Sequence, residues 1–296
     1  MQSLRDHILN LLKIAIGLGL LWFLYSRLEN PEALWNQVRS ANRWMLAAAL
    51  LTHSTAVALN ALKWGVLLRA QAIPASVPRL LGYQWMAIFF DNFFPAQLGG
   101  DVMRGYSLAR DTRRTADAAA SVLIDRFTGL TTFMLATAVA STAMLLWGGA
   151  PQPASADELA FLRFIDLRLI AVGSVMASIA LLTALALMLS RRTKRAVERI
   201  IVRLPLGDRV APIWRTAAQA INAYRHAYPA MLTASAMSAL IVAVTSVTVW
   251  LLANAIEPGS ISYLPILVIN PIIGFLAIIP LSPGGLGVRQ VAFAAL

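Results

Sequence analysis

Long apolar stretches without charged side chains dominate the pattern of hydrophobic and polar positions along this chain. Residues 127–147, 169–189 and 230–256 contain no Asp, Glu, Lys or Arg. Each stretch reaches the roughly 20 residues that a helix needs to cross the hydrocarbon core of a bilayer. The pattern therefore predicts an all-α, polytopic membrane protein, organised as a single membrane domain over residues 1–296.

Five stretches have the length of full transmembrane helices, and we expect these helices at residues 8–25, 44–62, 116–147, 167–189 and 230–256. The first helix should be retained, because no small-residue cleavage pattern follows Tyr25. A last apolar run, residues 288–296, is too short to cross a bilayer. We therefore expect the sequence to be truncated within a further helix, which would bring the number of full spans to about six.

Two apolar segments are too short to cross the membrane, and each ends at a proline. Residues 80–94 precede Pro95, and residues 264–279 precede Pro280. The first segment would be about 22 Å long as a helix, against about 30 Å of hydrocarbon. Non-helical backbone at membrane depth is tolerated where it is buried in protein or lines a cavity. We therefore expect two re-entrant half-helices, within residues 80–115 and 264–290.

The two short segments are followed by the same motif. The first copy reads Pro95-x3-Gly99-Gly100-x3-Arg104, and the second reads Pro280-x3-Gly284-Gly285-x3-Arg289. An odd number of expected full spans, three, separates the copies, so they should enter the membrane from opposite faces. This arrangement is an inverted repeat, as in transporters whose interrupted helices meet near the midplane.

Each position of the motif has a physical role. Proline ends a helix, because it lacks an amide donor, and paired glycines allow a tight reversal. Free amides at the start of the next helix bind anions, and an arginine one turn later adds a donor suited to phosphate. The motif is thus typical of an anionic headgroup site, which would include Gly287 of the second copy. The alternative is two tight turns with arginines that reach the membrane interface.

Other polar residues near the motif are candidates, since such groups are costly in lipid and often functional. Asn92 and Asp101 flank the first motif, although Asp101 could simply be an N-cap. Asp125 and Arg126 lie in an expected span, where they could bind substrate, pair with the Arg104 region or form a structural ion pair. His53 could relay protons or form a hydrogen bond between helices, and Asn270, which precedes Pro271 at an expected kink, is assigned no chemistry.

Composition and charge narrow the class of protein and its possible partners. Hydrophobic residues make up 58% of the chain and charged residues 13%, and the formal net charge is +11. Many of the basic residues fall within residues 191–228, which we place in the cytoplasm by the positive-inside rule. The loop 63–79, which contains Lys63, and the N-terminus are expected on the same side. The apolar spacing there predicts amphipathic helices that lie on anionic headgroups, or else an ordinary packed hairpin. No nucleic-acid-binding module is recognisable.

Enzyme signatures are not found in the sequence. There is no cysteine, and no P-loop, His-Glu-x2-His or Gly-x-Ser-x-Gly motif. We therefore expect no metal, no cofactor and no catalytic residue.

The first motif with Asn92, the stretch 119–126 and the second motif together resemble the lysylphosphatidylglycerol synthase transmembrane-region family. This family is the flippase-like membrane part of the bacterial multiple peptide resistance factor and of stand-alone proteins. The resemblance implies lipid translocation, with aminoacylated phosphatidylglycerol as the best-known cargo. Gln290 departs from an expected acidic residue, and no soluble aminoacyl-transferase domain follows, so lysyl-lipid synthesis is not expected of this chain.

We therefore predict a multi-pass flippase or transporter of the bacterial cytoplasmic membrane, with a phospholipid or lipid-linked phosphate as its partner. Two other classes stay open. A membrane-embedded lipid-phosphate transferase would need Asp91, Asp101 or Asp125 to converge on one pocket. A scaffold for a lipid-modifying enzyme would need no cavity at the midplane. A homo-oligomer is compatible with each of the three.

Overall fold

The computed structural model describes residue 36 and residues 39–91, 98–147, 167–203, 207–259 and 261–276 of the chain. This part of the chain folds into helices joined by short turns. The helices, in chain order, are α3 (Arg43–Ala70), α4 (Val77–Asp91), α5 (Leu98–Thr112), α6 (Thr115–Trp147), α7 (Leu167–Leu189), α8 (Arg191–Val202), α9 (Gly207–Asn222), the 3₁₀ helix η2 (Ala223–His226), α10 (Tyr228–Ile256) and α11 (Tyr263–Leu276).

Four of these helices, α3, α6, α7 and α10, are long and apolar enough to cross a membrane. They coincide with four of the five full spans expected from the sequence, so the prediction of an all-helical, multi-pass membrane protein is confirmed. The expected first span, residues 8–25, and the short run 288–296 lie outside the described residues.

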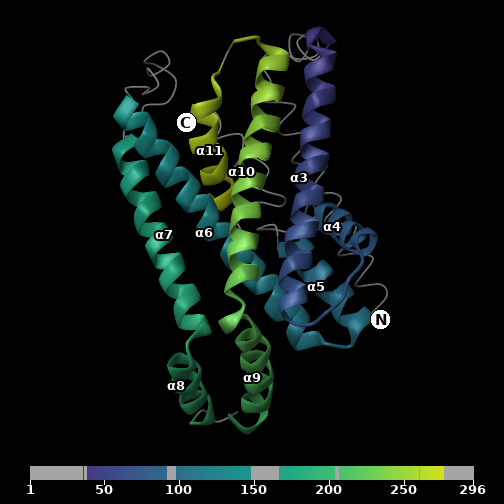
Figure 1. The fold of residues 1–296 in the computed structure, drawn as a ribbon, viewed down its shortest axis with the longest axis vertical. Coiled ribbons are helices and arrows are strands. Elements are labelled where there is room, and N and C mark those ends of the chain that lie inside the picture. The colour runs from purple at the N-terminus through teal and green to yellow at the C-terminus, as the bar shows by residue number, and fades with distance from the viewer. Residues whose placement is uncertain are drawn as a thin grey trace, which may run out of the picture.

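The most extensive contacts between helices are those of α10 with α3 and of α6 with α7. In Figure 1, α3 and α10 stand side by side, while α6 crosses obliquely behind α10 to pack on α7. The amide of Asn42 donates to the carbonyl of Ala255 (2.8 Å), which places the start of α3 beside the end of α10. The hydroxyls of Thr52 and Thr248 share a hydrogen bond (2.9 Å) further along the same pair. Such interhelical bonds satisfy polar groups that lipid cannot solvate.

The expected end of the second span, at residue 62, is wrong. The helix continues to Ala70, so Lys63 lies inside α3 and is 5% exposed, not in a cytoplasmic loop. A lysine inside a helix of the bundle is tolerated when a buried carboxylate neutralises it, and Asp125 of α6 does so. The boundary was misjudged because that partner is 62 positions away in the sequence.

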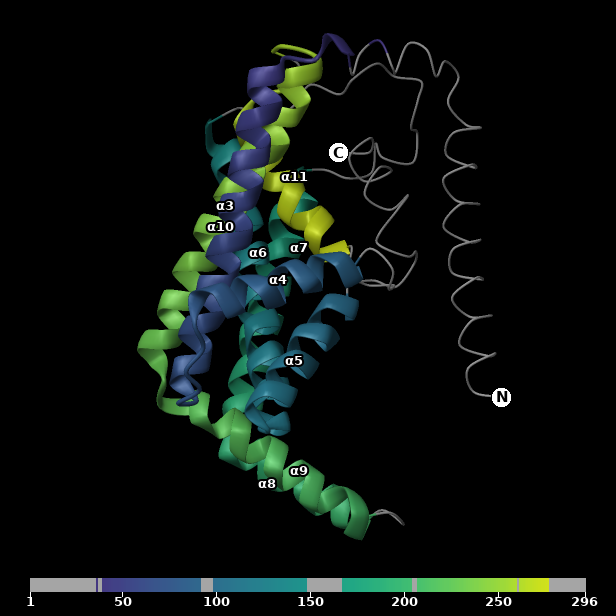
Figure 2. The same ribbon diagram turned by 90° about the vertical axis from the view of Figure 1, so that its right-hand side faces the viewer.

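Helices α4 and α5 form an antiparallel pair on one side of the bundle. Figure 2 shows the end of α4 and the start of α5 side by side partway up the bundle. At the other end of the pair, Arg114 donates to the carbonyls of Gln71 (3.1 Å) and Ala72 (3.4 Å). The segments before α4 and after α5 therefore lie together, as a re-entrant hairpin requires. That the pair re-enters a membrane stays a prediction.

The second short segment is also helical, as α11, with Pro271 inside the helix. It packs on α6 and α10. Its motif, from Pro280 to Arg289, lies outside the described residues, so the inverted repeat also stays a prediction.

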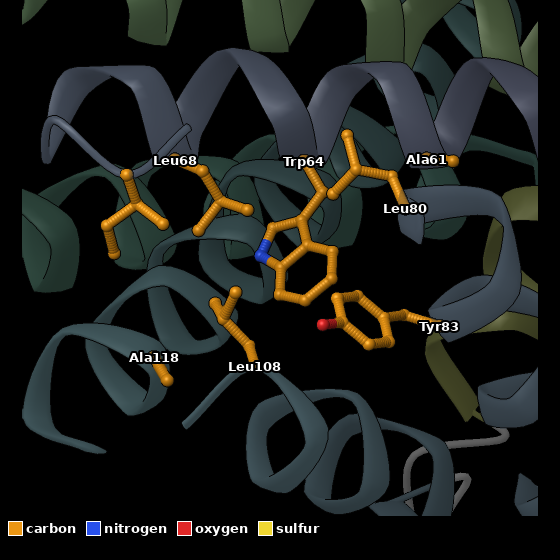
Figure 3. Close-up of a cluster of buried hydrophobic side chains, with 8 residues drawn as sticks. Ala61, Trp64, Leu68, Leu80, Tyr83, Leu108 and Ala118 are labelled. Carbon is orange, nitrogen blue, oxygen red and sulfur yellow. The ribbon is translucent and has the colours of Figure 1, made fainter. Parts of the chain in front are cut away.

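An aromatic cluster fastens α4 and α5 to α3 and α6. Trp64 of α3 is fully buried, and the ring of Tyr83 meets it edge-on at a centroid distance of 6.0 Å (Figure 3). Leu108 of α5 and Ala118 of α6 complete the cluster. Aromatic pairs in this geometry add about 0.5–1.5 kcal/mol beyond the area that they bury. The cluster thus holds the α4–α5 pair in a defined position.

Helices α8 and α9 form a hairpin that extends beyond the bundle (Figures 1 and 2). Only Ser190 separates α8 from the end of α7. The indole of Trp214 donates to the carbonyl of Lys194 (3.4 Å), and Arg215 pairs with Glu198, so the two helices pack on each other. Burial lowers the pKa of Lys194, and the charges of Arg225 and Arg191 lower it further. The helices expected in this basic segment are confirmed.

Candidate functional site

Asp125 of α6 is the centre of a buried group of charges. One carboxylate oxygen lies 2.9 Å from Nζ of Lys63, and the other lies 2.7 Å from Nη2 of Arg104. The side chains of all three residues are at most 7% exposed. A buried carboxylate must be neutralised, and here two cations from two other helices, α3 and α5, share that task. Asp125 therefore links the three helices α3, α5 and α6.

Asp101 extends the charge group by one more step. One of its carboxylate oxygens lies 2.8 Å from Nη2 of Arg104, and the other lies 2.7 Å from Nε of Arg126. The result is an alternating row of cations and carboxylates, Lys63–Asp125–Arg104–Asp101–Arg126. Asp101 thus acts as a bridge between α5 and α6 and not only as a carboxylate in the first turn of α5.

The start of α5 is occupied by a carboxylate of the chain itself. The amide of Gly100 donates to Oδ1 of Asp91 (2.8 Å). A Cβ at Gly100 would lie 2.5 Å from the carbonyl oxygen of Ala87 and 2.6 Å from Oδ2 of Asp91. Glycine is therefore required for the close approach of α5 to α4. This amide was expected to donate to a ligand. In this conformation it donates to Asp91 instead.

A cavity of about 260 Å³ opens beside the charge group, between α3, α4, α5, α6 and α10. This volume is below the roughly 300–1,000 Å³ of pockets that bury a drug-sized ligand whole, so it suits a small polar headgroup. Apolar walls are supplied by residues such as Val57, Leu130 and Phe133. The polar lining consists of His53, Asn60, Lys63, Gln84, Asp91, Asp101, Arg104, Asp125, Arg126, Ser238 and Thr245.

Arg104 is held in place but keeps one free donor. Its guanidinium lies over the ring of Trp64, 5.1 Å from the centroid, and the Trp64 indole donates to Ser121 (3.2 Å). Nη2 and Nε of Arg104 bond to carboxylates, whereas Nη1 has no hydrogen-bond partner among the described residues. A buried donor without a partner is rare and costly. Nη1 therefore keeps donor capacity that no described residue uses.

The structure brings together several of the residues that the sequence suggested. Asp101, Arg104, Asp125 and Arg126 form one connected row, and Gly99 and Gly100 lie buried in the first turn of α5. The expected pairing of Asp125 with the Arg104 region is confirmed. The remaining candidates lie outside the described residues, namely Asn92, Pro95, Pro280, Gly284, Gly285, Gly287 and Arg289.

Lys63 is the charged residue of the described cavity that sequence reasoning did not assign to the site; the polar residues Asn60, Gln84, Ser238 and Thr245 were missed as well. It was assigned to a cytoplasmic loop, yet it lies one turn after Asn60 on the cavity side of α3. The signal that could have revealed it is the charge of Asp125, which needs a cation from another helix.

Two other polar residues lie at or near the cavity. Asn270, assigned no chemistry, donates to the hydroxyls of Thr245 and Ser246 (both 3.1 Å), and Thr245 lines the cavity. His53 lines the cavity, and its neighbour Thr52 makes an interhelical hydrogen bond to Thr248.

The fold and the site define a class of protein: a multi-pass helical membrane protein with a charged cavity enclosed by its spans. Within that class, the chain belongs to the family described as the lysylphosphatidylglycerol synthase TM region, whose family model matches residues 10–296. The resemblance noted from the motifs is thereby confirmed. No curated protein and no solved structure matches the chain.

Proposed function

We propose that this protein is a flippase or transporter that moves a phospholipid or lipid-linked phosphate, anionic or aminoacylated, across the bacterial cytoplasmic membrane. The observation that carries the proposal is the cavity lined by Lys63, Arg104 and Arg126. Ionisable groups among membrane spans are expensive, and they typically mark a substrate path. The cavity would take the headgroup, while the acyl chains stay in the bilayer.

The row of ion pairs supports an anionic headgroup. Asp101 and Asp125 hold the cations at fixed positions, so that a phosphate meets donors already in place. Arg104 is stacked on Trp64, which fixes the plane of its guanidinium. A planar, permanently charged guanidinium suits phosphate oxygens.

The arrangement of α4 and α5 supports movement between the two sides of a membrane. Each of these helices has 15 residues, about half of the 28 in α3, and Arg114, just after α5, contacts the segment before α4 at Gln71 and Ala72. We interpret the pair as a re-entrant hairpin that reaches the cavity from the cytoplasmic side. The second motif, Pro280 to Arg289, would enter from the opposite side, as in transporters with inverted repeats.

The orientation follows from the basic hairpin. Five arginines of α8 are exposed at that end of the bundle, namely Arg191, Arg192, Arg195, Arg199 and, just after the helix, Arg203. The positive-inside rule places this end, and with it the N-terminus, in the cytoplasm.

Transport can be tested in vesicles that contain the purified full chain and fluorescent phosphatidylglycerol. A membrane-impermeant reductant bleaches the fluorophore in the outer leaflet, so movement between the leaflets appears as additional bleaching. We expect the chain to accelerate it and Arg104→Ala to reduce the rate about tenfold or more, since a charged hydrogen bond contributes about 1.5–3 kcal/mol. Arg110→Ala, on the exposed end of the same helix, is the matched control. Unchanged movement with Arg104→Ala would contradict the proposal.

One observation favours a second candidate function, a lipid-phosphate transferase. Asp91, Asp101 and Asp125 all line the same cavity, as that function requires. However, Asp101 and Asp125 are both paired with cations, which makes them weak bases. Release of free phosphate or a modified lipid in the same vesicles would favour the transferase over transport alone. A scaffold is less well supported, because a cavity lies among the spans.

A further inference from the structure

Asp91 differs from the other two carboxylates of the cavity. Asp101 and Asp125 each lie within 3 Å of two cationic side chains. Asp91, in contrast, has no ion-pair partner among the described residues and accepts only the amide of Gly100. It lines the cavity and is half-buried, so water or a ligand in the cavity can reach it. Its charge is therefore the least compensated one in the cavity.

The neighbours of Asp91 act on it with both signs of charge. Helix α5 contributes Asp101, which repels its charge, and Arg104, which attracts it, while α6 contributes Arg126 and, further away, Asp125. Lys63 and His53 face the same cavity from α3, whereas α10 contributes only hydroxyls there, from Ser238 and Thr245.

The charge balance of the cavity depends on the state of Asp91. Among the described residues, three cations (Lys63, Arg104, Arg126) and three carboxylates (Asp91, Asp101, Asp125) line the cavity, so their formal charges sum to zero when all are ionised. One proton on Asp91 raises the sum to +1. In a medium of low dielectric constant, an uncompensated charge is strongly disfavoured. An anionic headgroup is therefore accommodated better when Asp91 is protonated.

We propose that Asp91 takes up one proton when an anionic lipid headgroup enters the cavity, and releases it when the headgroup leaves. The proton comes from water and forms an O–H bond on the carboxylate, and the same bond breaks on release, so no oxidant or other reactant is required. Headgroup and proton then bind cooperatively, each raising the affinity for the other. This inference rests on the proposed function and names the co-substrate of the same site.

Gly100 gives the coupling a second contact. Its amide donates to the Asp91 carboxylate at 2.8 Å. A neutral carboxyl accepts hydrogen bonds less strongly than a carboxylate. Protonation of Asp91 therefore frees this amide, at the start of α5, to donate to a phosphate oxygen. The same proton thus lowers the negative charge of the cavity and supplies a donor to the headgroup.

The test uses the purified full chain in detergent and dihexanoyl phosphatidylglycerol as a soluble probe. Proton uptake on binding is read with a pH dye in weak buffer, and the affinity is measured by calorimetry at a series of pH values. We expect uptake of up to one proton per bound lipid and an affinity that falls by up to about tenfold per pH unit on the alkaline side.

Two variants separate Asp91 from other titrating groups. Asp91→Asn keeps an oxygen for the Gly100 amide, and it should bind the lipid with no proton uptake and little dependence on pH. Asp117→Asn removes a carboxylate that pairs with Arg114 outside the cavity, and it should behave like the unchanged chain. If Asp91→Asn does not fold, the infrared difference spectrum of the unchanged chain decides, because lipid binding should convert a carboxylate band into a carboxylic acid band.

Each result has a definite meaning. Lipid binding without proton uptake, proton uptake that persists in Asp91→Asn, or an infrared spectrum without the acid band would overturn the coupling and leave the transport proposal intact. Failure of the unchanged chain to bind the lipid at every pH would overturn both.

Discussion

Lys63 on α3 and Asp125 on α6 meet across the bundle, with 2.9 Å between Nζ and the carboxylate oxygen, and neither side chain is more than 7% exposed. Arg104 approaches the same carboxylate from α5. Lys63 and Asp125 are 62 positions apart in the sequence, and Arg104 lies between them. No local sequence pattern predicts that the three residues meet. Because each of the three helices supplies one charge, the position of each helix determines the electrostatics of the cavity.

The first prediction concerns the unequal cost of removing these charges. Asp125→Asn leaves two cations without their shared carboxylate, whereas Lys63→Met leaves Asp125 with Arg104. Loss of one partner of a buried pair typically costs about 3–5 kcal/mol. We expect both variants to lower the melting temperature in detergent, and Asp125→Asn to lower it more.

The double variant Lys63→Met with Asp125→Asn serves as the control for this coupling. It should lose less stability than the sum of the two single variants. In the double variant both charges of the pair are gone, so neither one is left buried without the other. Additive losses would show that Lys63 and Asp125 do not stabilise each other.

The second prediction concerns the close approach of α4 and α5. A methyl group at Gly100 would lie 2.5 Å from the carbonyl oxygen of Ala87, which is backbone and cannot move away alone. We expect Gly100→Ala to push the start of α5 away from α4, to reduce lipid movement in vesicles and to lower the melting temperature.

Gly82 of α4 provides a matched control, because a Cβ there meets no atom within 4 Å. Gly82→Ala should be neutral or raise stability by up to about 1 kcal/mol through helix propensity. Equal effects of the two substitutions would argue against a specific close approach at Gly100.

The third prediction distinguishes the two interpretations of the basic hairpin. α8 and α9 pack on each other, yet Ile200 is 62% exposed among the exposed arginines of α8. Branched apolar side chains beside arginines are typical of helices that lie on anionic headgroups. The chain has no cysteine, so a single Ile200→Cys can carry a polarity-sensitive dye.

In vesicles that contain phosphatidylglycerol, we expect the dye at position 200 to shift its emission to the blue and to be quenched by spin-labelled lipid. The effect should weaken in vesicles of phosphatidylcholine alone. Thr216→Cys, at an exposed position of α9, is the comparison site. A dye at position 200 that stays in water in both lipids would favour an ordinary packed hairpin.

Much of the fold could be predicted from local sequence. The stretch that became α7 was expected with the same bounds, residues 167–189, because residues 169–189 are free of charge and arginines follow at once. The end of α3 could not be predicted in this way. Lys63 marks the end of an apolar run locally, but the partner that keeps it within the bundle belongs to α6.

In the candidate site, too, some features could be predicted from local sequence and others depend on a partner in another helix. The Gly99-Gly100 pair and Arg104 were recognised because proline, glycine and arginine each have strong local preferences. The tight reversal expected at the two glycines is wrong, because both lie inside helix α5. That Asp91 would occupy the Gly100 amide could not be foreseen, since it requires the end of α4 to lie against the start of α5. The second motif, from Pro280 to Arg289, stays a prediction from the sequence.

The sequence by itself determined that the chain is a multi-pass helical membrane protein with glycine pairs and charged residues near its short segments. These features depend on hydrophobic length and local backbone preference, which act over one or two helical turns. Only the tertiary structure decided which charges meet, because a pair such as Lys63 and Asp125 depends on how whole helices pack. The same packing left Asp91 without a cation among the described residues, and so made its charge the variable one in the cavity.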